Sequence, residues 1–410
     1  MDILMLTSVY PQPDDGEYKT TPTVKYFCEE WAKMGYRVVV IQNDSKFPCL
    51  VYHMPSFIKK VVETKMQIQI PNPSSRKDLK YINNGVVVYR KNLTKYLPHG
   101  AFPKISIEKQ GNFILSVIEE ENLKPDIIIG HWVNPQLELL KWLKKHYNSH
   151  YITSLVFHND CEERDVETYN IRENISYVDV IGCRNERYGR IIKERLKLSY
   201  FPFICYSGIP NSTVYSADIK QILEIKQPDT YLYVGRIVKY KRLDSVIDAL
   251  YKFGRNKKYF LTIIGEGNEK ESILATINDN KMSSHVSFID KLPRDEVFEE
   301  MKKNEIFTLI SENETFGMVY LEAMLMGCIT IASKGCALDG IIIDGENGFL
   351  CEQGNAVELE RIYNRINEMS ENDKHNMMIK AHNTALQFSD HNVAARYLDE
   401  IHRLSITKKS

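Results

Sequence analysis

The chain has 410 residues, of which 43% are hydrophobic, and a formal net charge of −1. This length suits two domains of ordinary size, and the balanced charge gives no indication of a nucleic-acid partner. Eight cysteines are scattered without a C-x-x-C pair, which argues against a disulfide framework or a zinc site. No apolar run approaches the roughly 20 residues of a membrane-spanning helix. A strand-like run follows Met1 almost at once, so we expect no signal peptide and a cytoplasmic location.

The first residues have the pattern strand, loop, helix, strand. Strand-like runs cover residues 3–9 and 38–42, and a helical pattern covers 22–34. This order is typical of the start of a parallel sheet. The first loop contains one glycine, Gly16, where a ligand could approach the backbone closely. A simple turn explains this glycine equally well.

Residues 47–104 interrupt this alternation, because they combine many lysines and arginines with interleaved apolar side chains. Two interpretations stay open. The segment is either a solvated basic face over ordinary core residues or a basic amphipathic surface in peripheral contact with the inner, anionic membrane surface.

Histidines follow two consecutive predicted strands. A strand over 125–130 leads to His131, and a strand over 151–157 leads to His158. The carboxyl ends of parallel strands meet at one edge of a sheet, where ligands bind in open α/β domains. Two histidines at equivalent ends therefore favour a site over two isolated structural residues. A third strand, over 177–183, is followed by Arg184.

We predict a first domain over 1–205 and a second domain over 206–389. The linker that leads into the second domain lies at about 206–228. In the second domain, the predicted strand from Tyr231 ends at Arg236, and Lys241 opens the next helix. Two cations at a helix start are unfavourable for the helix dipole unless an anion is present. A diphosphate is the natural ligand, because arginine binds it bidentately and lysine acts as a point charge.

Residues 305–332 predict a strand, a polar turn, a helix over 315–326 and a second strand. Glu314 and Glu322 lie about 12 Å apart along this helix at ~1.5 Å per residue. That spacing is too long for a shared proton but suits the two ends of an extended ligand. The first backbone amides of the helix have no helical acceptor and favour a phosphate. These amides belong to Phe316, Gly317, Met318 and Val319.

The motifs E-T-F-G-M-V-Y-L-E and V-G-R-x4-K resemble those of the family 4, or group 1, retaining glycosyltransferases. The resemblance implies the GT-B fold, with two doubly wound, Rossmann-like parallel-sheet α/β domains facing each other across a cleft. It also implies that the last helix, within 390–410, crosses back onto the first domain. Many relatives have a glutamate where Gly340 stands, and this chain offers Asp339 one position earlier.

The resemblance also implies a role for each candidate residue. Arg236 and Lys241 would bind the donor diphosphate, and the amides of 316–319 would orient the sugar and phosphate. Glu314 would hold sugar hydroxyls, and Glu322 would hold the ribose. His131 and His158 would each hydrogen-bond the sugar. In this family a donor phosphate oxygen takes the proton of the acceptor, which fits the absence of an obvious catalytic base. No metal or other cofactor is expected.

The expected activity is transfer of a hexose-type sugar from a nucleotide-diphosphate donor, UDP favoured over GDP. The expected acceptor is a glycan or lipid-linked oligosaccharide in surface polysaccharide biosynthesis. A nucleotide-sugar 2-epimerase and a non-catalytic nucleotide-sugar-binding protein stay open as alternatives. No D-x-D pair occurs to bridge a metal, and no P-loop occurs that would support an ATPase.

Overall fold

The computed structural model describes residues 1–11, 22–52, 54–55, 57–58, 60–61, 78–97, 99–255, 257–312 and 314–407. Gly16 and much of the basic segment therefore lie outside the described residues. The chain forms two compact units. The N-terminal unit contains 1–184, 188–205 and 394–410, and the C-terminal unit contains 185–187 and 206–393.

The N-terminal unit is built on an eight-stranded sheet with the order β3-β4-β2-β1-β5-β6-β7-β8. Its strands are β1 (Asp2–Thr7), β2 (Arg37–Lys46), β3 (Leu79–Asn83), β4 (Val86–Thr94), β5 (Pro125–His131), β6 (Ile152–Phe157), β7 (Val180–Cys183) and β8 (Phe203–Ile204). All neighbours pair in parallel except the antiparallel pair β3 and β4. The central strands are buried along nearly their whole length, as expected for a parallel sheet covered on both faces.

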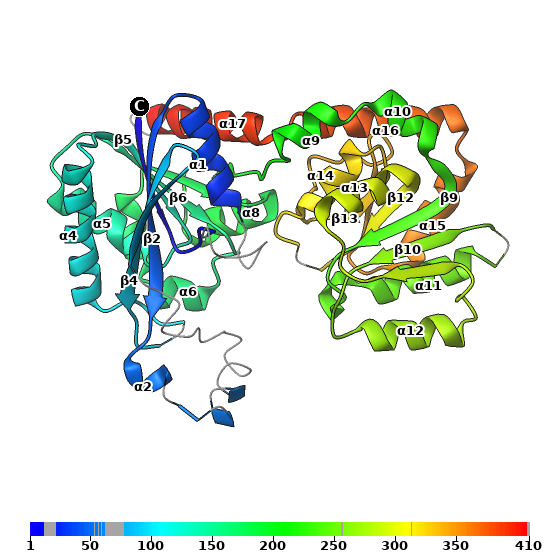
Figure 1. Ribbon diagram of the computed structural model, residues 1–410, viewed down its shortest axis with the longest axis horizontal. Helices are drawn as coiled ribbons and strands as arrows, with labels where there is room; N and C mark the ends of the chain where they lie inside the picture. The colour runs from blue at the N-terminus through cyan, green and yellow to red at the C-terminus, as the bar shows by residue number, and fades with distance from the viewer. Residues whose placement is uncertain are drawn as a thin grey trace. The chain divides into compact units, whose positions relative to one another are not determined.

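Helices cover both faces of this sheet (Figure 1). Helices α4, α5 and α7 pack on one face, and α1 and the final helix α17 lie together on the other. The helices of this unit are α1 (Thr23–Lys33), α2 (Cys49–Tyr52), α4 (Lys104–Glu120), α5 (Gln136–His146), α6 (Glu163–Thr168), α7 (Ile171–Asn174), α8 (Glu186–Arg195) and α17 (Asp390–Thr407). The indole nitrogen of Trp31 donates a hydrogen bond of 2.9 Å to the carbonyl of Ala394, which ties α1 to α17.

The C-terminal unit has a six-stranded, fully parallel sheet with the order β11-β10-β9-β12-β13-β14. Its strands are β9 (Gln227–Val234), β10 (Phe260–Ile264), β11 (Val286–Ile289), β12 (Asn304–Leu309), β13 (Ile329–Ser333) and β14 (Phe349–Cys351). Helices α11 (Leu243–Phe253), α12 (Lys270–Asp279) and α15 (Ala356–Glu368) cover one face. The other face carries α10 (Ile219–Ile225), α13 (Arg294–Lys303), α14 (Met318–Leu325) and α16 (Glu371–Leu386) (Figure 1).

The predicted fold class is confirmed, since both units are α/β domains built on parallel sheets. Two local predictions were wrong. Helix α14 begins at Met318 and not at Thr315, and Lys241 lies in a 3-10 turn before α11. The predicted linker segment contains α9 (Asn211–Ser216) and α10. Among the described helices, none is long and apolar enough to cross a membrane.

Candidate active site

Among the described parallel strands of each sheet, the strand order reverses at one point. In the C-terminal unit this point lies between β9 and β12, and in the N-terminal unit between β1 and β5. The connections that leave two such strands turn to opposite faces of the sheet and leave a crevice at the carboxyl edge. Lys241 follows β9 and Glu314 follows β12, so both flank the crevice of the C-terminal unit.

Lys241 and Glu314 form an ion pair across this crevice. Their side chains are only 14% and 13% exposed, so the two charges are largely removed from water. The Lys241 ammonium also lies 5.5 Å from the centre of the Tyr240 ring. The structure therefore joins two predicted site residues that are 73 positions apart in the sequence.

Arg236 is exposed and donates a hydrogen bond to the hydroxyl of Tyr240, which places a second cation beside Lys241. The loop that carries Arg236 is held by the glycine turn after β10. The amide of Ile237 donates to the carbonyl of Glu266 at 2.8 Å. A Cβ at Gly267 would lie 2.0 Å from the Ile237 carbonyl oxygen. Gly265 and Gly267 thus let this turn pack closely against the loop that carries Arg236.

Gly317 forms the N-cap of α14 with φ +64°. A Cβ there would lie 2.5 Å from the ring of Tyr320, so glycine is required for both conformation and space. The amides that precede the helical ladder are therefore those of Gly317, Met318 and Val319, because the Tyr320 amide bonds back to the Gly317 carbonyl. Phe316 precedes the helix, and its side chain is buried.

Glu322 lies one turn further along α14, where its carboxylate pairs with Arg294 at the start of α13. The Glu322 side chain is 10% exposed and the Arg294 side chain 28%. Sequence reasoning missed Arg294. An arginine in the first turn of a helix opposes the helix dipole, and that signal could have marked it as the partner of an acid.

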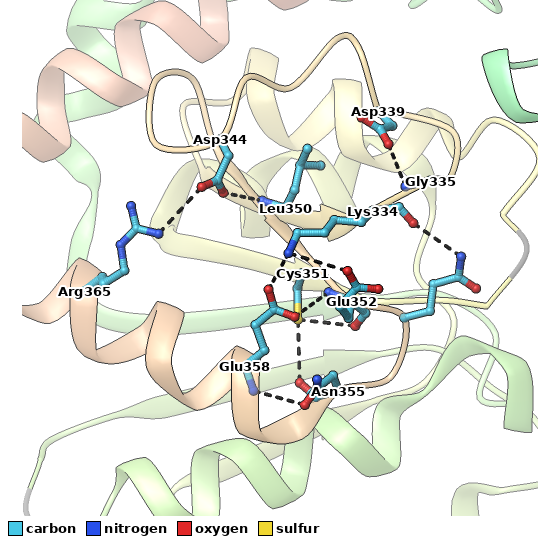
Figure 2. Close-up of polar contacts among 11 residues, drawn as sticks. Lys334, Gly335, Asp339, Asp344, Leu350, Cys351, Glu352, Asn355, Glu358 and Arg365 are labelled. Atoms are coloured by element: carbon cyan, nitrogen blue, oxygen red, sulfur yellow. Dashed lines mark hydrogen bonds and ion pairs between the residues drawn. The ribbon is translucent and has the colours of Figure 1, made fainter.

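The loop after β13 is folded onto itself (Figure 2). The carboxylate of Asp339, a candidate sugar contact, accepts a hydrogen bond of 2.7 Å from the amide of Gly335. Figure 2 also shows Lys334 turned toward Glu352 and Glu358, with the closer ion pair to Glu358 at 2.6 Å. These contacts tie the carboxyl ends of β13 and β14 to α15.

In the N-terminal unit the two predicted histidines meet. Nδ1 of His131 lies 2.9 Å from Nε2 of His158, and Nε2 of His131 lies 3.0 Å from the Tyr397 hydroxyl. The ring of His158 stacks on Trp132 with centres 3.9 Å apart. His131 is fully buried, and both its ring nitrogens have protein partners.

Both imidazoles are neutral at physiological pH. Burial, aided by the nearby charge of Arg184, lowers the pKa of His131 to about 3. Burial also holds the pKa of His158 well below its usual value. Arg184 itself is buried and donates a hydrogen bond of 2.6 Å to the Cys205 carbonyl, so its guanidinium supports β8.

Several cations of the segment 47–104 serve the N-terminal unit itself. Lys80 pairs with Glu120 at 2.7 Å and Lys91 with Asp78 at 2.6 Å. Lys95 is buried, with its ammonium 5.0 Å from the centre of the Phe102 ring. The alternative of a basic face over a core is thus supported for these residues, and the membrane contact stays a prediction.

Comparison with solved structures identifies the class of fold. The chain resembles a glycosyltransferase from Rickettsia africae (TM-score 0.68, 12% identity, 98% of each chain). It also resembles sucrose-phosphate synthase from Thermosynechococcus elongatus (TM-score 0.67, 16% identity, 99% of this chain and 100% of that one). Anabaena HepE in complex with UDP gives a TM-score of 0.64 at 15% identity, covering 98% and 100%. The fold is that of the GT-B glycosyltransferases.

Sequence comparison then identifies the domain. Residues 215–384 match the family described as glycosyl transferases group 1. An uncharacterized glycosyltransferase of Methanocaldococcus jannaschii is 27% identical over 62% of this chain and 68% of its own length. N-acetyl-alpha-D-glucosaminyl L-malate synthase of Bacillus anthracis is 26% identical over 45% of this chain and 49% of its own length. The C-terminal half therefore carries a group 1 glycosyltransferase domain, and the chain is a transferase enzyme.

Proposed function

We propose that the chain is a family 4 enzyme that transfers a hexose from a nucleotide-diphosphate donor to a glycan or lipid-linked oligosaccharide, with retention of anomeric configuration. The observation that carries this proposal is the pairing of Lys241 with Glu314 at the β9/β12 crevice. UDP is favoured as the nucleotide of the donor, since structures of Anabaena HepE contain UDP and UDP-glucose. Surface polysaccharide biosynthesis is the corresponding pathway class.

The ion pair suggests how the donor is bound. The diphosphate would compete with Glu314 for Lys241 and would draw Arg236 alongside, because a dianion is the stronger partner for two cations. Glu314 would then be released to accept hydrogen bonds from sugar hydroxyls. The amides of Gly317, Met318 and Val319 would orient the sugar and phosphate at the positive end of α14.

Lys241 and Arg236 would also stabilise the charge that develops on the leaving diphosphate, the main electrostatic task of this reaction. A donor phosphate oxygen would take the proton of the acceptor hydroxyl. We therefore propose catalysis without a metal ion or another cofactor. Glu322, held by Arg294, would bind the ribose hydroxyls.

The acceptor would bind the N-terminal unit. A cavity of about 740 Å³ opens there, lined by Val133 and Asn134 after β5 and by residues of α4 and α5. Its lining mixes aromatic, amide and charged side chains, a composition that suits a glycan. His158 would contact the sugar, and His131 would act through it, because both nitrogens of His131 are already hydrogen-bonded.

A thermal-shift panel of nucleotide hexoses tests the donor assignment, because a ligand at 100 times its Kd stabilises the folded state by about 2.7 kcal/mol. We expect UDP-hexoses to raise the melting temperature of the wild type but not of Lys241→Ala. Product analysis without acceptor separates the alternatives, since an epimerase would convert the donor alone. Failure of every nucleotide sugar to bind would contradict the proposal.

A further inference from the structure

A chain of hydrogen bonds links helix α17 to the carboxyl end of β6. The hydroxyl of Tyr397 contacts Nε2 of His131, and Nδ1 of His131 contacts Nε2 of His158. The Tyr397 ring is held edge-on against Phe27 and Trp31, with ring centres 5.2 and 5.4 Å away. The phenol is therefore fixed by packing as well as by its hydrogen bond.

The groups in this chain of hydrogen bonds have few protons to donate. Both imidazoles are neutral, so each carries one N–H and one bare nitrogen. His131 must donate through one of its nitrogens and accept through the other, because both are hydrogen-bonded. The direction in which Tyr397 points its hydrogen thus decides the tautomers of both rings.

The phenol is the stronger donor of the pair, because a phenolic O–H is more acidic than the N–H of a neutral imidazole. Tyr397 therefore donates to Nε2 of His131, and His131 donates from Nδ1 to Nε2 of His158. The proton of His158 must then reside on Nδ1. Among the described residues, none forms a hydrogen bond with that Nδ1.

The orientation of His158 is fixed as well. Its ring stacks on Trp132 at an interplanar angle of 12°. Trp132 has φ +65°, a conformation that non-glycine residues adopt only when the surroundings support it, and its amide bonds to the Val156 carbonyl at 3.2 Å. The ring of His158 is therefore constrained on its face by Trp132 and on one edge by His131.

We propose that Tyr397 and His131 are positioning residues that hold His158 as the Nδ1–H tautomer, so that His158 donates a hydrogen bond to a substrate oxygen. The inference rests on the proposed function only in taking that oxygen as part of the transferred sugar or its acceptor. A helix from the far end of the chain thereby sets the hydrogen-bonding direction of a residue at the predicted sugar site.

Long-range ¹H–¹⁵N correlation spectra of the full chain, labelled at histidine nitrogen, test the tautomer directly. The His158 signals are assigned with a His158→Gln variant. We expect His158 to be protonated on Nδ1 in the wild type and to become a mixture of tautomers in Tyr397→Phe, which keeps the ring but loses the hydroxyl. A wild-type His158 protonated on Nε2 would overturn the proposal, whether or not the chain transfers sugar.

Steady-state kinetics provide the second readout. Tyr397→Phe should lower kcat about tenfold, the size expected for one lost orienting hydrogen bond, with the donor KM unchanged. Tyr363→Phe is the matched control, because it removes another buried hydroxyl, bonded to Thr308 Oγ1 at 3.1 Å, in the other unit. The control should lose stability but keep its kcat and its His158 tautomer.

The outcomes separate the two proposals. An Nδ1–H tautomer of His158 in a protein that transfers no sugar would support the positioning role of Tyr397 and His131 and contradict the proposed function. An unchanged His158 tautomer and an unchanged kcat in Tyr397→Phe would contradict the positioning role and would not affect the proposed function. If Tyr397→Phe does not fold, His131→Phe removes both bonds and should release the His158 tautomer in the same spectra.

Discussion

The two units place opposite kinds of chemistry at equivalent edges of their sheets. The crevice of the C-terminal unit holds charged side chains that are paired with each other, Lys241 with Glu314 and Glu322 with Arg294. The edge of the N-terminal unit holds neutral imidazoles in a buried chain of hydrogen bonds. Paired charges are ready to exchange partners with an ionic ligand, whereas a neutral network fixes the direction of its hydrogen bonds.

The largest expected effect comes from breaking the charged pair. Lys241→Ala should lower kcat at least about 100-fold, because in the proposed function it removes a cation that stabilises the leaving diphosphate. Lys252→Ala is the control, since Lys252 lies on the neighbouring helix α11 and pairs with Asp248 at 2.8 Å. Initial rates with a saturating nucleotide sugar measure both. Wild-type turnover in Lys241→Ala would remove the assigned site.

A prediction of intermediate size concerns Lys95, a buried cation in the unit whose sheet edge holds neutral imidazoles. Burial lowers its pKa to about 8, below the unfolded value of about 10.5. At pH 7 the lysine is charged in both states, and the folded state bears the full penalty. Between pH 8 and 10.5 the unfolded chain binds more protons, so stability rises with pH. Lys95→Met should therefore raise the unfolding free energy by roughly 2–3 kcal/mol at pH 7 and by almost nothing at pH 10.5.

Urea titrations at the two pH values measure this difference. Lys91→Met serves as the control, because Lys91 is paired with Asp78 and 35% exposed. It should change stability by less than about 1 kcal/mol at either pH. An equal loss of stability in both variants would show that the Lys95 ammonium is not penalised by burial.

The sequence predicted those parts of the site that local spacing determines. Arg236, Lys241 and Glu314 follow predicted strands, and Glu322 lies within the predicted helix. The structure brings Lys241 and Glu314 together. The turn Asn84-Gly85 joins β3 to β4 with both residues at positive φ, and an Asn-Gly pair is itself a local hairpin signal.

Other features depend on tertiary structure. Arg294 reaches Glu322 across 28 positions, and Tyr397 reaches His131 across 266. Such pairs depend on which helices pack together, and the periodicity of a single sequence does not predict that packing.

A smaller effect is expected from Arg294, because in the proposed function it acts on the ribose only through Glu322. Arg294→Met should raise the donor KM about tenfold and leave kcat nearly unchanged, since loss of one charge-assisted contact weakens binding by about 1.4 kcal/mol. Arg365→Met is the matched control, because Arg365 forms a 3.6 Å ion pair with the exposed Asp344 (Figure 2). A change in kcat without a change in KM would assign Arg294 to the chemical step instead.

The smallest effect, none within error, is expected from chelation. If the positive charge that faces the diphosphate is supplied by Lys241 and Arg236, then EDTA should leave the transfer rate unchanged in the wild type. Added Mg²⁺ should also fail to restore Lys241→Ala, because no D-x-D pair is present to hold a metal on the diphosphate. Rates with and without EDTA, in metal-free buffer, measure this. A strong loss of activity that Mg²⁺ reverses would mean that Lys241 and Arg236 alone do not neutralise the leaving diphosphate. The charged site of the C-terminal unit would then include a metal ion.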